Sequence, residues 1–132
     1  MKVVLDASCA LEIALNKRDA DHLRDLLEQS AEALAPDLLI PEFVNGLWKL
    51  HQLSDLDLEM CDQALDILPD LVNVLVSSAE LSREAFALSR TQKTRAAYDM
   101  FYLALALREN AILLTLDGTL KKEARRVGIR VA

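Results

Sequence analysis

The stretch Lys2-Val-Val-Leu5, followed directly by Asp6, decides the fold class of this chain. It is short, apolar and rich in β-branched residues, which is typical of a buried strand. A similar run, Ala111-Ile-Leu-Leu-Thr-Leu116, lies near the other end of the chain and is followed by Asp117. Strands of a parallel sheet that feed helices end at one edge, so we expect the two aspartates at that edge.

Helical and strand-like segments alternate between these two runs. Further strands are predicted at residues 33–35, 71–76 and 129–131. Helices are predicted at residues 8–15, 19–32, 38–53, 54–68, 77–92, 96–108 and 118–127, with Ser54 capping the fourth, Pro69 ending it and Gly128 ending the last. This alternation predicts an α/β fold, with a central parallel sheet of four to five short strands flanked by helices on both faces.

The composition is that of a folded, ordinary-sized domain. The chain has 132 residues, of which 52% are hydrophobic and 27% charged, and it contains no linker or internal repeat. We therefore expect residues 1–132 to form a single domain. The first apolar run is cut short by Asp6, and no run approaches the roughly 18 apolar residues of a membrane span. Cys9 and Cys61 form no zinc motif, and a cytoplasmic protein without membrane contact is expected.

Charge is distributed unevenly along the chain. Taken alone, the net charge of −6 argues against a nucleic-acid-binding protein. Residues 83–132, however, carry 10 basic and 5 acidic side chains, which leaves room for a local phosphate-binding surface. The candidate RNA-binding face lies on the predicted helix after Asp117 and comprises Lys121, Lys122, Arg125 and Arg126. An ordinary solvated helix face is the simpler interpretation of the same residues.

Four acidic residues form the candidate site. Asp6 and Asp117 follow strands, and Glu42 lies in about the first turn of the helix after the second strand, so the connectivity places these three along one edge. Asp99 is not placed by the connectivity, but it is the only charge in the apolar segment 96–107, where an unpaired carboxylate would be costly. Simpler interpretations exist, because acidic residues commonly cap helices or occupy their first turns.

Clustered carboxylates favour a bound cation. Four such groups would repel one another and raise their own pKa values unless positive charge lay among them. Ligand sets made only of oxygen select hard cations, which here means Mg²⁺ or Mn²⁺. Ions of this kind activate water and hold a scissile phosphate.

Several uncharged or basic residues lie close to these acids in the sequence. Ser8 and Thr115 are each two positions from an aspartate at a strand end, and we favour hydrogen bonds to the backbone for both hydroxyls. Glu42, Asn45 and Lys49 lie at helical spacing and form a polar stripe on an otherwise apolar helix.

Four segments together resemble the motifs of PIN-domain nucleases, and most closely those of the VapC-type toxins of toxin–antitoxin pairs. The resemblance covers essentially the whole chain, in the order and at the intervals of that family. The segments are Val3-Val-Leu-Asp6-Ala-Ser8, Pro41-Glu-Phe-Val-Asn45, Tyr98-Asp-Met-Phe-Tyr-Leu-Ala-Leu-Ala106 and Leu114-Thr-Leu-Asp117.

The resemblance implies a PIN-like (flavodoxin-like) sheet and a Mg²⁺- or Mn²⁺-dependent endoribonuclease. It further implies an RNA substrate, a homodimer, and a small antitoxin partner that occludes the site and binds DNA. The implied catalytic and metal-binding residues are Asp6, Glu42, Asp99 and Asp117, with Ser8 and Asn45 in supporting positions and Thr115 as a further supporting candidate. At Gly118-Thr119, where some relatives carry another acid, this chain has none.

Two alternatives remain open at this level. The first is a PIN-like module that binds RNA or protein without cutting. The second is a phosphoacceptor receiver domain, which is disfavoured because Asp6 is followed by Ala-Ser and the third strand leads into Ser77-Ser78. No glycine-rich nucleotide-binding loop is present, which excludes a dinucleotide enzyme or a P-loop NTPase.

Overall fold

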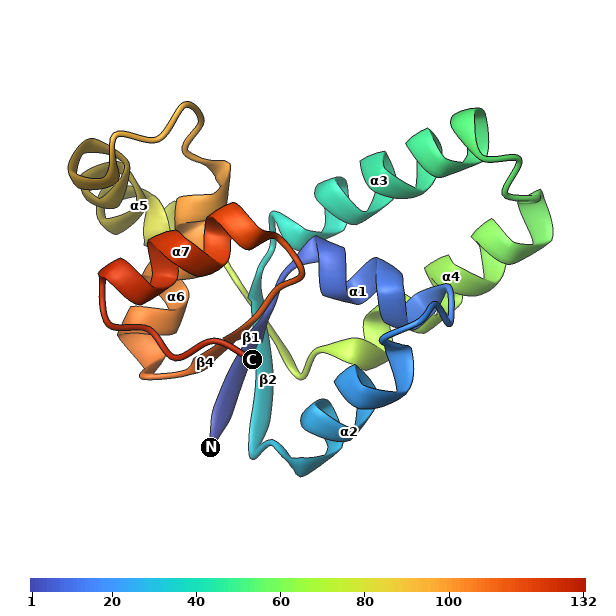
Figure 1. Cartoon of the computed structure of the whole chain (residues 1–132), viewed down its shortest axis with the longest axis horizontal. Coiled ribbons are helices and arrows are strands. Elements are labelled where there is room, and N and C mark those ends of the chain that lie inside the picture. The colour runs from blue at the N-terminus through green and yellow to red at the C-terminus, as the bar shows by residue number, and fades with distance from the viewer.

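The computed structural model describes residues 1–132 as seven helices around a four-stranded sheet (Figure 1). The strands are β1 (Lys2–Leu5), β2 (Glu32–Pro36), β3 (Val74–Val76) and β4 (Ile112–Leu114). The helices are α1 (Ala7–Ala14), α2 (Ala20–Gln29), α3 (Leu39–Leu53), α4 (Leu58–Leu71), α5 (Ser78–Gln92), α6 (Tyr98–Glu109) and α7 (Gly118–Arg126). All strand pairs are parallel, in the order β3-β2-β1-β4. The predicted α/β fold is confirmed.

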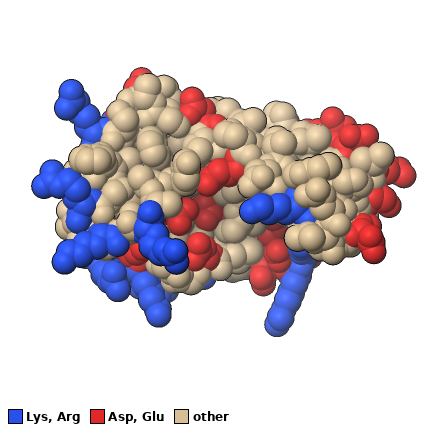
Figure 2. Space-filling view, turned by 90° about the horizontal axis from the view of Figure 1, so that it is seen from above, with Lys and Arg blue, Asp and Glu red and all other residues tan.

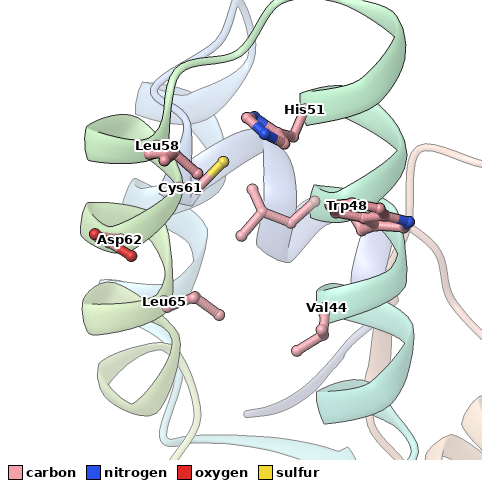
Figure 3. Close-up of a pocket in the computed structure, with 8 residues that line it drawn as sticks. Val44, Trp48, His51, Leu58, Cys61, Asp62 and Leu65 are labelled. Atoms are coloured by element: carbon pink, nitrogen blue, oxygen red, sulfur yellow. The ribbon is translucent and has the colours of Figure 1, made fainter.

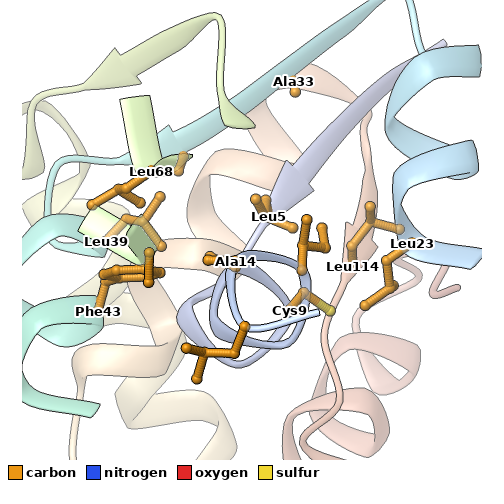
Figure 4. Close-up of a cluster of buried hydrophobic side chains, with 14 of the residues drawn as sticks. Leu5, Cys9, Ala14, Leu23, Ala33, Leu39, Phe43, Leu68 and Leu114 are labelled. Atoms are coloured by element: carbon orange, nitrogen blue, oxygen red, sulfur yellow. The ribbon is translucent and has the colours of Figure 1, made fainter. Parts of the chain in front are cut away.

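Two hydrophobic clusters hold helices against the two faces of the sheet. Successive side chains of β1 point to opposite faces, so Val3 and Leu5 join one cluster and Val4 joins the other. The first cluster packs α1, α2, α3 and α4 against the sheet, and Figure 4 shows Leu5, Cys9 and Phe43 within it. The second cluster packs α5, α6 and α7 against the other face. Each fully buried Leu or Phe contributes about 1.5–3 kcal/mol to this packing.

The strand order creates a crevice at the site predicted from the sequence. β2 and β3 extend the sheet on one side of β1, whereas β4 pairs with its other side. In open parallel sheets, ligands bind outside the carboxyl ends of the strands at such a reversal of strand order. Asp6 directly follows β1, and Asp117 comes three residues after the end of β4.

Several predicted boundaries of strands, and the end of one predicted helix, were wrong. Residues 129–131 form no strand, and Val131 makes only a single parallel bridge with Leu113. The predicted helix over 19–32 ends at Gln29 because Glu32 already pairs with Lys2 in the sheet. The strand predicted at 71–76 begins only at Val74.

The prediction for the start and end of α4 was also wrong. Ser54 ends α3, and the residue that caps α4 is Asp57, whose carboxylate accepts a hydrogen bond from the Met60 N–H. The helix continues through Pro69 to Leu71. Pro69 lies in the last turn of α4, where its missing N–H removes the hydrogen bond to the Leu65 carbonyl one turn earlier.

Helices α3 and α4 extend away from the sheet as an arm (Figure 1). Between them lies an apolar groove of about 240 Å³, shown in Figure 3 and lined by Val44, Leu47, Trp48, His51, Leu58, Cys61, Asp62 and Leu65. Trp48 is 55% exposed and Leu58 67% exposed, so large apolar side chains face solvent here. None of the seven helices combines the length and apolar character needed to cross a membrane.

Candidate functional site

The four predicted carboxylates line one cavity at the carboxyl ends of β1 and β4. The cavity has a volume of about 230 Å³ and is lined by Asp6, Ala7, Ser8, Glu42, Asn45, Gly46, Lys49, Asp99, Tyr102 and Asp117. Figure 2 looks onto this end of the molecule and shows acidic atoms inside a central hollow. The structure therefore brings the four acids together, including Asp99, which the connectivity alone left unplaced.

Asp6 is the most buried of the four, with 5% of its surface exposed. Its Oδ1 accepts hydrogen bonds from the Ser8 hydroxyl at 2.6 Å and from the Cys9 N–H at 3.1 Å, and its Oδ2 accepts one from the Thr115 hydroxyl. Burial raises the pKa of Asp6, and these hydrogen bonds act against the rise. Hydrogen bonds to both of its oxygens thus fix the orientation of the Asp6 carboxylate.

Ser8 and Thr115 each bond to the backbone as well as to Asp6. The Ser8 oxygen accepts the Leu116 N–H at 2.9 Å, and the Thr115 oxygen accepts the Asp117 N–H at 3.0 Å. The favoured backbone partners are therefore present, and the Asp6 carboxylate is a second partner of both hydroxyls. A hydroxyl donates one hydrogen bond while accepting others, so each residue fills both roles. Together they link the chain segments that follow β1 and β4.

Asp117 is exposed and also caps α7. Its Oδ1 accepts the N–H groups of Thr119 at 2.9 Å and Leu120 at 3.3 Å. Asp6 caps α1 in the same way. The simpler capping interpretation is therefore correct for both residues, and it is compatible with a further role. Capping uses Oδ1 of Asp117 and leaves its Oδ2 without a hydrogen bond in the chain.

Glu42 lies in the first turn of α3, and a side chain of α6 fixes its position. The Tyr102 hydroxyl donates a 2.6 Å hydrogen bond to Glu42 Oε1. Burial raises the pKa of Glu42, while the Tyr102 hydrogen bond opposes the rise and the charge of Asp6 adds to it. From the sequence, Tyr102 was taken only as part of an apolar segment. The missed signal is that a buried tyrosine hydroxyl needs a partner, and that Tyr102 follows Asp99 at helical spacing.

Asp99 lies half-buried in the first turn of α6, facing uncompensated negative charge. Burial and then the charges of Asp117, Glu42, Asp6 and Glu123 raise its pKa to about 6. Every one of these influences raises the pKa, and none is a hydrogen bond or a positive charge. A cation in the cavity would relieve this repulsion.

One further charged residue lines the cavity, and another lies near enough for its charge to raise the pKa of Asp99. Lys49 is the one basic side chain among the lining residues. Glu123 lies on α7, where burial raises its pKa, Arg126 acts against the rise and Asp117 adds to it. Glu123 was not singled out from the sequence because it lies within a run of basic residues, although it belongs to the helix that Asp117 caps.

The donor set of the cavity fits a hard cation. No three His, Cys, Asp or Glu side chains of the chain form a ready-made metal cluster. Mg²⁺ keeps several of its waters and is usually held by only one or two carboxylates directly, so it requires no such cluster. An open cavity lined by carboxylate, hydroxyl and amide oxygens is suited to an ion of this type.

The basic face of α7 comprises Lys121, Lys122, Arg125 and Arg126 and begins one turn after Asp117. Lys121 is half-buried and the other three side chains are exposed. Figure 2 shows Lys and Arg gathered at the end of the molecule where α5, α6 and α7 lie, on its left. The predicted face therefore exists as a surface, on the helix that is capped by the cavity residue Asp117.

Known proteins resemble this chain over nearly its whole length. The model of the PIN domain family matches residues 3–125. The curated protein Ribonuclease VapC3 of Pyrobaculum aerophilum is 30% identical over 125 residues, which cover 93% of this chain and 95% of that protein. This match overturns the receiver-domain alternative.

Solved structures share the fold. VapBC2 of Rickettsia felis, bound to a DNA fragment from its promoter, gives a TM-score of 0.71 at 18% identity, covering 100% of this chain and 98% of that one. A protein of Pyrobaculum aerophilum gives 0.69 at 22% identity, covering 99% of this chain and 89% of its own. FitAcB of Neisseria gonorrhoeae gives 0.64 at 14% identity, covering 98% and 95%. The chain belongs to the PIN domain family, as a VapC-type member.

Proposed function

We propose that this chain is a divalent-metal-dependent endoribonuclease and the toxin of a toxin–antitoxin pair. The observation that carries the proposal is the environment of Asp99. Burial and the other carboxylates of one cavity raise its pKa to about 6. Buried, mutually repelling acids in a cleft are typical of a catalytic or metal site. The relative named as a ribonuclease supports RNA as the substrate.

Asp6, Glu42, Asp99 and Asp117 are the proposed metal-binding and catalytic residues, with Mg²⁺ or Mn²⁺ as the cofactor. When bound, such an ion supplies positive charge to the scissile phosphate and makes a water molecule more acidic. The hydroxyls of Ser8 and Thr115 hold Asp6 in one orientation, as their hydrogen bonds indicate.

The remaining polar groups have distinct proposed tasks. Tyr102 holds the Glu42 carboxylate toward the cavity. Asn45 is a supporting residue whose amide lines the cavity without carrying charge. Lys49 offers a positive charge at the cavity wall, where it would bind a phosphate oxygen of the substrate. The basic face of α7 would bind neighbouring RNA phosphates.

We further propose a small antitoxin as the partner, as the VapBC2 structure suggests for this fold. The apolar groove between α3 and α4 supports this proposal, because apolar side chains of an amphipathic segment would be buried there (Figure 3). Residues that line the groove and residues that line the cavity occupy opposite faces of α3. A partner seated in the groove could therefore cross α3 and place a basic side chain among the carboxylates.

Three further properties belong to the same proposal. Both hydrophobic clusters share one sheet, which supports a single domain over residues 1–132. The resemblance to VapC-type toxins supports a homodimer and a cytoplasmic location. Sedimentation of the purified chain tests the dimer directly.

A PIN-like binding module without nuclease activity is the second candidate, because no three acids form a ready-made metal cluster. One experiment separates the two. Purified protein is incubated with mixed cellular RNA, with Mg²⁺, with Mn²⁺ and with a chelator. We expect shortened RNA only where a divalent ion is present. Intact RNA that is nevertheless retained by the protein would instead establish the binding module.

A further inference from the structure

A second cavity adjoins the acidic one. Its volume is about 370 Å³, and it is lined by Leu38, Pro41, Glu42, Asn45 and Tyr98. Glu42 and Asn45 belong to both cavities. A ligand that extends from the acidic cavity along α3 would therefore enter this one.

The lining of this second cavity combines an exposed ring with one neutral amide. Tyr98 is 62% exposed, although it begins a helix whose next turns are largely buried. The aromatic pair within the chain is Trp48 with His51, so the Tyr98 ring has no aromatic partner. Leu38 and Pro41 add apolar surface, and the exposed Asn45 amide offers both donors and an acceptor.

These features fit a flat ligand with a polar edge. A nucleobase has an apolar face that stacks on an aromatic ring and an edge that hydrogen-bonds to an amide. The only charged lining residue is Glu42, at the boundary with the acidic cavity, so the second cavity lacks the positive charge that a phosphate requires. The phosphate and the base of one nucleotide would thus be separated between the two cavities.

We propose that the second cavity is a nucleobase subsite. In it the Tyr98 ring stacks on an unpaired base beside the scissile phosphate, and the Asn45 amide bonds to the edge of that base. The subsite rests on the proposed function, since its position beside the cut requires the acidic cavity to be the cleavage site. It directs cleavage to single-stranded RNA, because a base within a duplex is not free to enter the cavity.

Binding of short RNA to cleavage-deficient protein tests the subsite. The probes are single-stranded RNA hexamers, intact or with an abasic ribose at each position in turn, added with Mg²⁺ to protein carrying Asp99→Asn. In that background Tyr98→Ala removes the ring and Tyr98→Phe retains it. Phe86→Ala is the matched control, because Phe86 is 66% exposed on α5 and lines neither cavity.

The expected result is a penalty at one abasic position that depends on Tyr98. Tyr98→Ala should weaken binding of the intact hexamer roughly 5- to 150-fold, the usual effect of removing one base–aromatic stack. The hexamer that lacks this base should bind to the same variant with the affinity that it has for the Asp99→Asn protein. Tyr98→Phe and Phe86→Ala should leave the affinities unchanged.

The other outcomes show whether the subsite or the proposed function is wrong. The subsite is overturned if Tyr98→Ala leaves the affinity for every hexamer equal to that of the Asp99→Asn protein. It is also overturned if the Asp99→Asn protein binds none of the hexamers. Cleavage of RNA by the parent protein in that case leaves the proposed function standing. A Tyr98-dependent abasic penalty in a protein whose parent cuts no RNA would support base binding while removing the nuclease.

Discussion

The hydroxyl of Tyr102 donates a 2.6 Å hydrogen bond to Oε1 of Glu42, and this contact joins α6 to the first turn of α3. Tyr102 is 1% exposed, so its position is fixed by the packing of α6 against the sheet. Asp99 lies one turn earlier on the same helix and lines the same cavity. The buried core of α6 therefore controls the positions of two acids of the proposed site, one directly and one through a hydrogen bond.

Tyr102→Phe tests this control. The ring would still fill its place in the core, but Glu42 would be left without its donor. We expect the free energy of unfolding to fall by about 0.5–1.5 kcal/mol, the usual net value of such a hydrogen bond. We expect kcat for RNA cleavage to fall with little change in KM, because Tyr102 acts on Glu42 rather than on the substrate. Phe86→Ala is the control for kcat, since the exposed Phe86 side chain on α5 lines neither cavity. Equal kcat for Tyr102→Phe and the parent would contradict this positioning role.

Asp99→Asn should not destabilise the metal-free protein at neutral pH. The pKa of Asp99 is raised from its ordinary 3.8 to about 6, so the folded state holds this proton more tightly than the unfolded state does. The contribution of Asp99 to stability is therefore greatest below about pH 4 and is lost as the pH rises to about 6. Because asparagine does not ionise, the variant does not lose stability in this way as the pH rises. Thermal unfolding with a chelator present, between about pH 4 and pH 7.5, should give a Tm near pH 7 equal to or above that of the parent. A variant that is clearly less stable at neutral pH would argue against repulsion at this site.

The basic face of α7 should set the salt dependence of RNA binding. Changing Lys121, Lys122, Arg125 and Arg126 together to alanine removes the positive charge of up to four side chains from the RNA phosphates. For single-stranded RNA, the slope of log affinity against log salt should become shallower by about 0.7 for each phosphate that is no longer neutralised. The corresponding control changes Arg18 and Arg24, which lie on the α1–α2 side of the molecule. An unchanged slope in the α7 variant would assign that face to solubility alone.

The sequence was most informative where one physical requirement dominated. Buried β-branched runs predicted β1 and β4, and parallel connectivity predicted that Asp6 and Asp117 would meet at one edge. Apart from the family resemblance, Asp99 was singled out because a charge in an apolar helix needs compensation. The Tyr102–Glu42 hydrogen bond was not predicted, since it depends on how α6 packs against α3 across 60 positions of sequence. The start of α4 was misplaced because both Ser54 and Asp57 are good cap residues, and Ser54 instead ends α3, where its N–H bonds to the Leu50 carbonyl.

Expression of this chain alone in a bacterial host should arrest growth if it is a toxin. Without a cation, the four carboxylates form a negative pocket that an Arg or Lys side chain of a partner would bind, in competition with the metal. Asp6→Ala should relieve the arrest, and so should co-expression of a small partner encoded next to this chain. Colony counts after induction give the result. Harmless expression of a folded protein that cuts RNA in vitro would retain the nuclease and remove the toxin role.

The most direct test of the acidic cavity is the rate of RNA cleavage by the parent and by Asp99→Asn as Mg²⁺ is titrated to saturation. Isothermal titration of the same two proteins with Mn²⁺ reports ion binding independently of cleavage. If the carboxylates hold the ion, the parent cleaves RNA in a Mg²⁺-dependent manner. Asp99→Asn should then remain folded, bind Mn²⁺ more weakly and show no cleavage above background at any Mg²⁺ concentration. Equal cleavage rates and equal Mn²⁺ affinities for the two proteins would contradict a metal site built on Asp99.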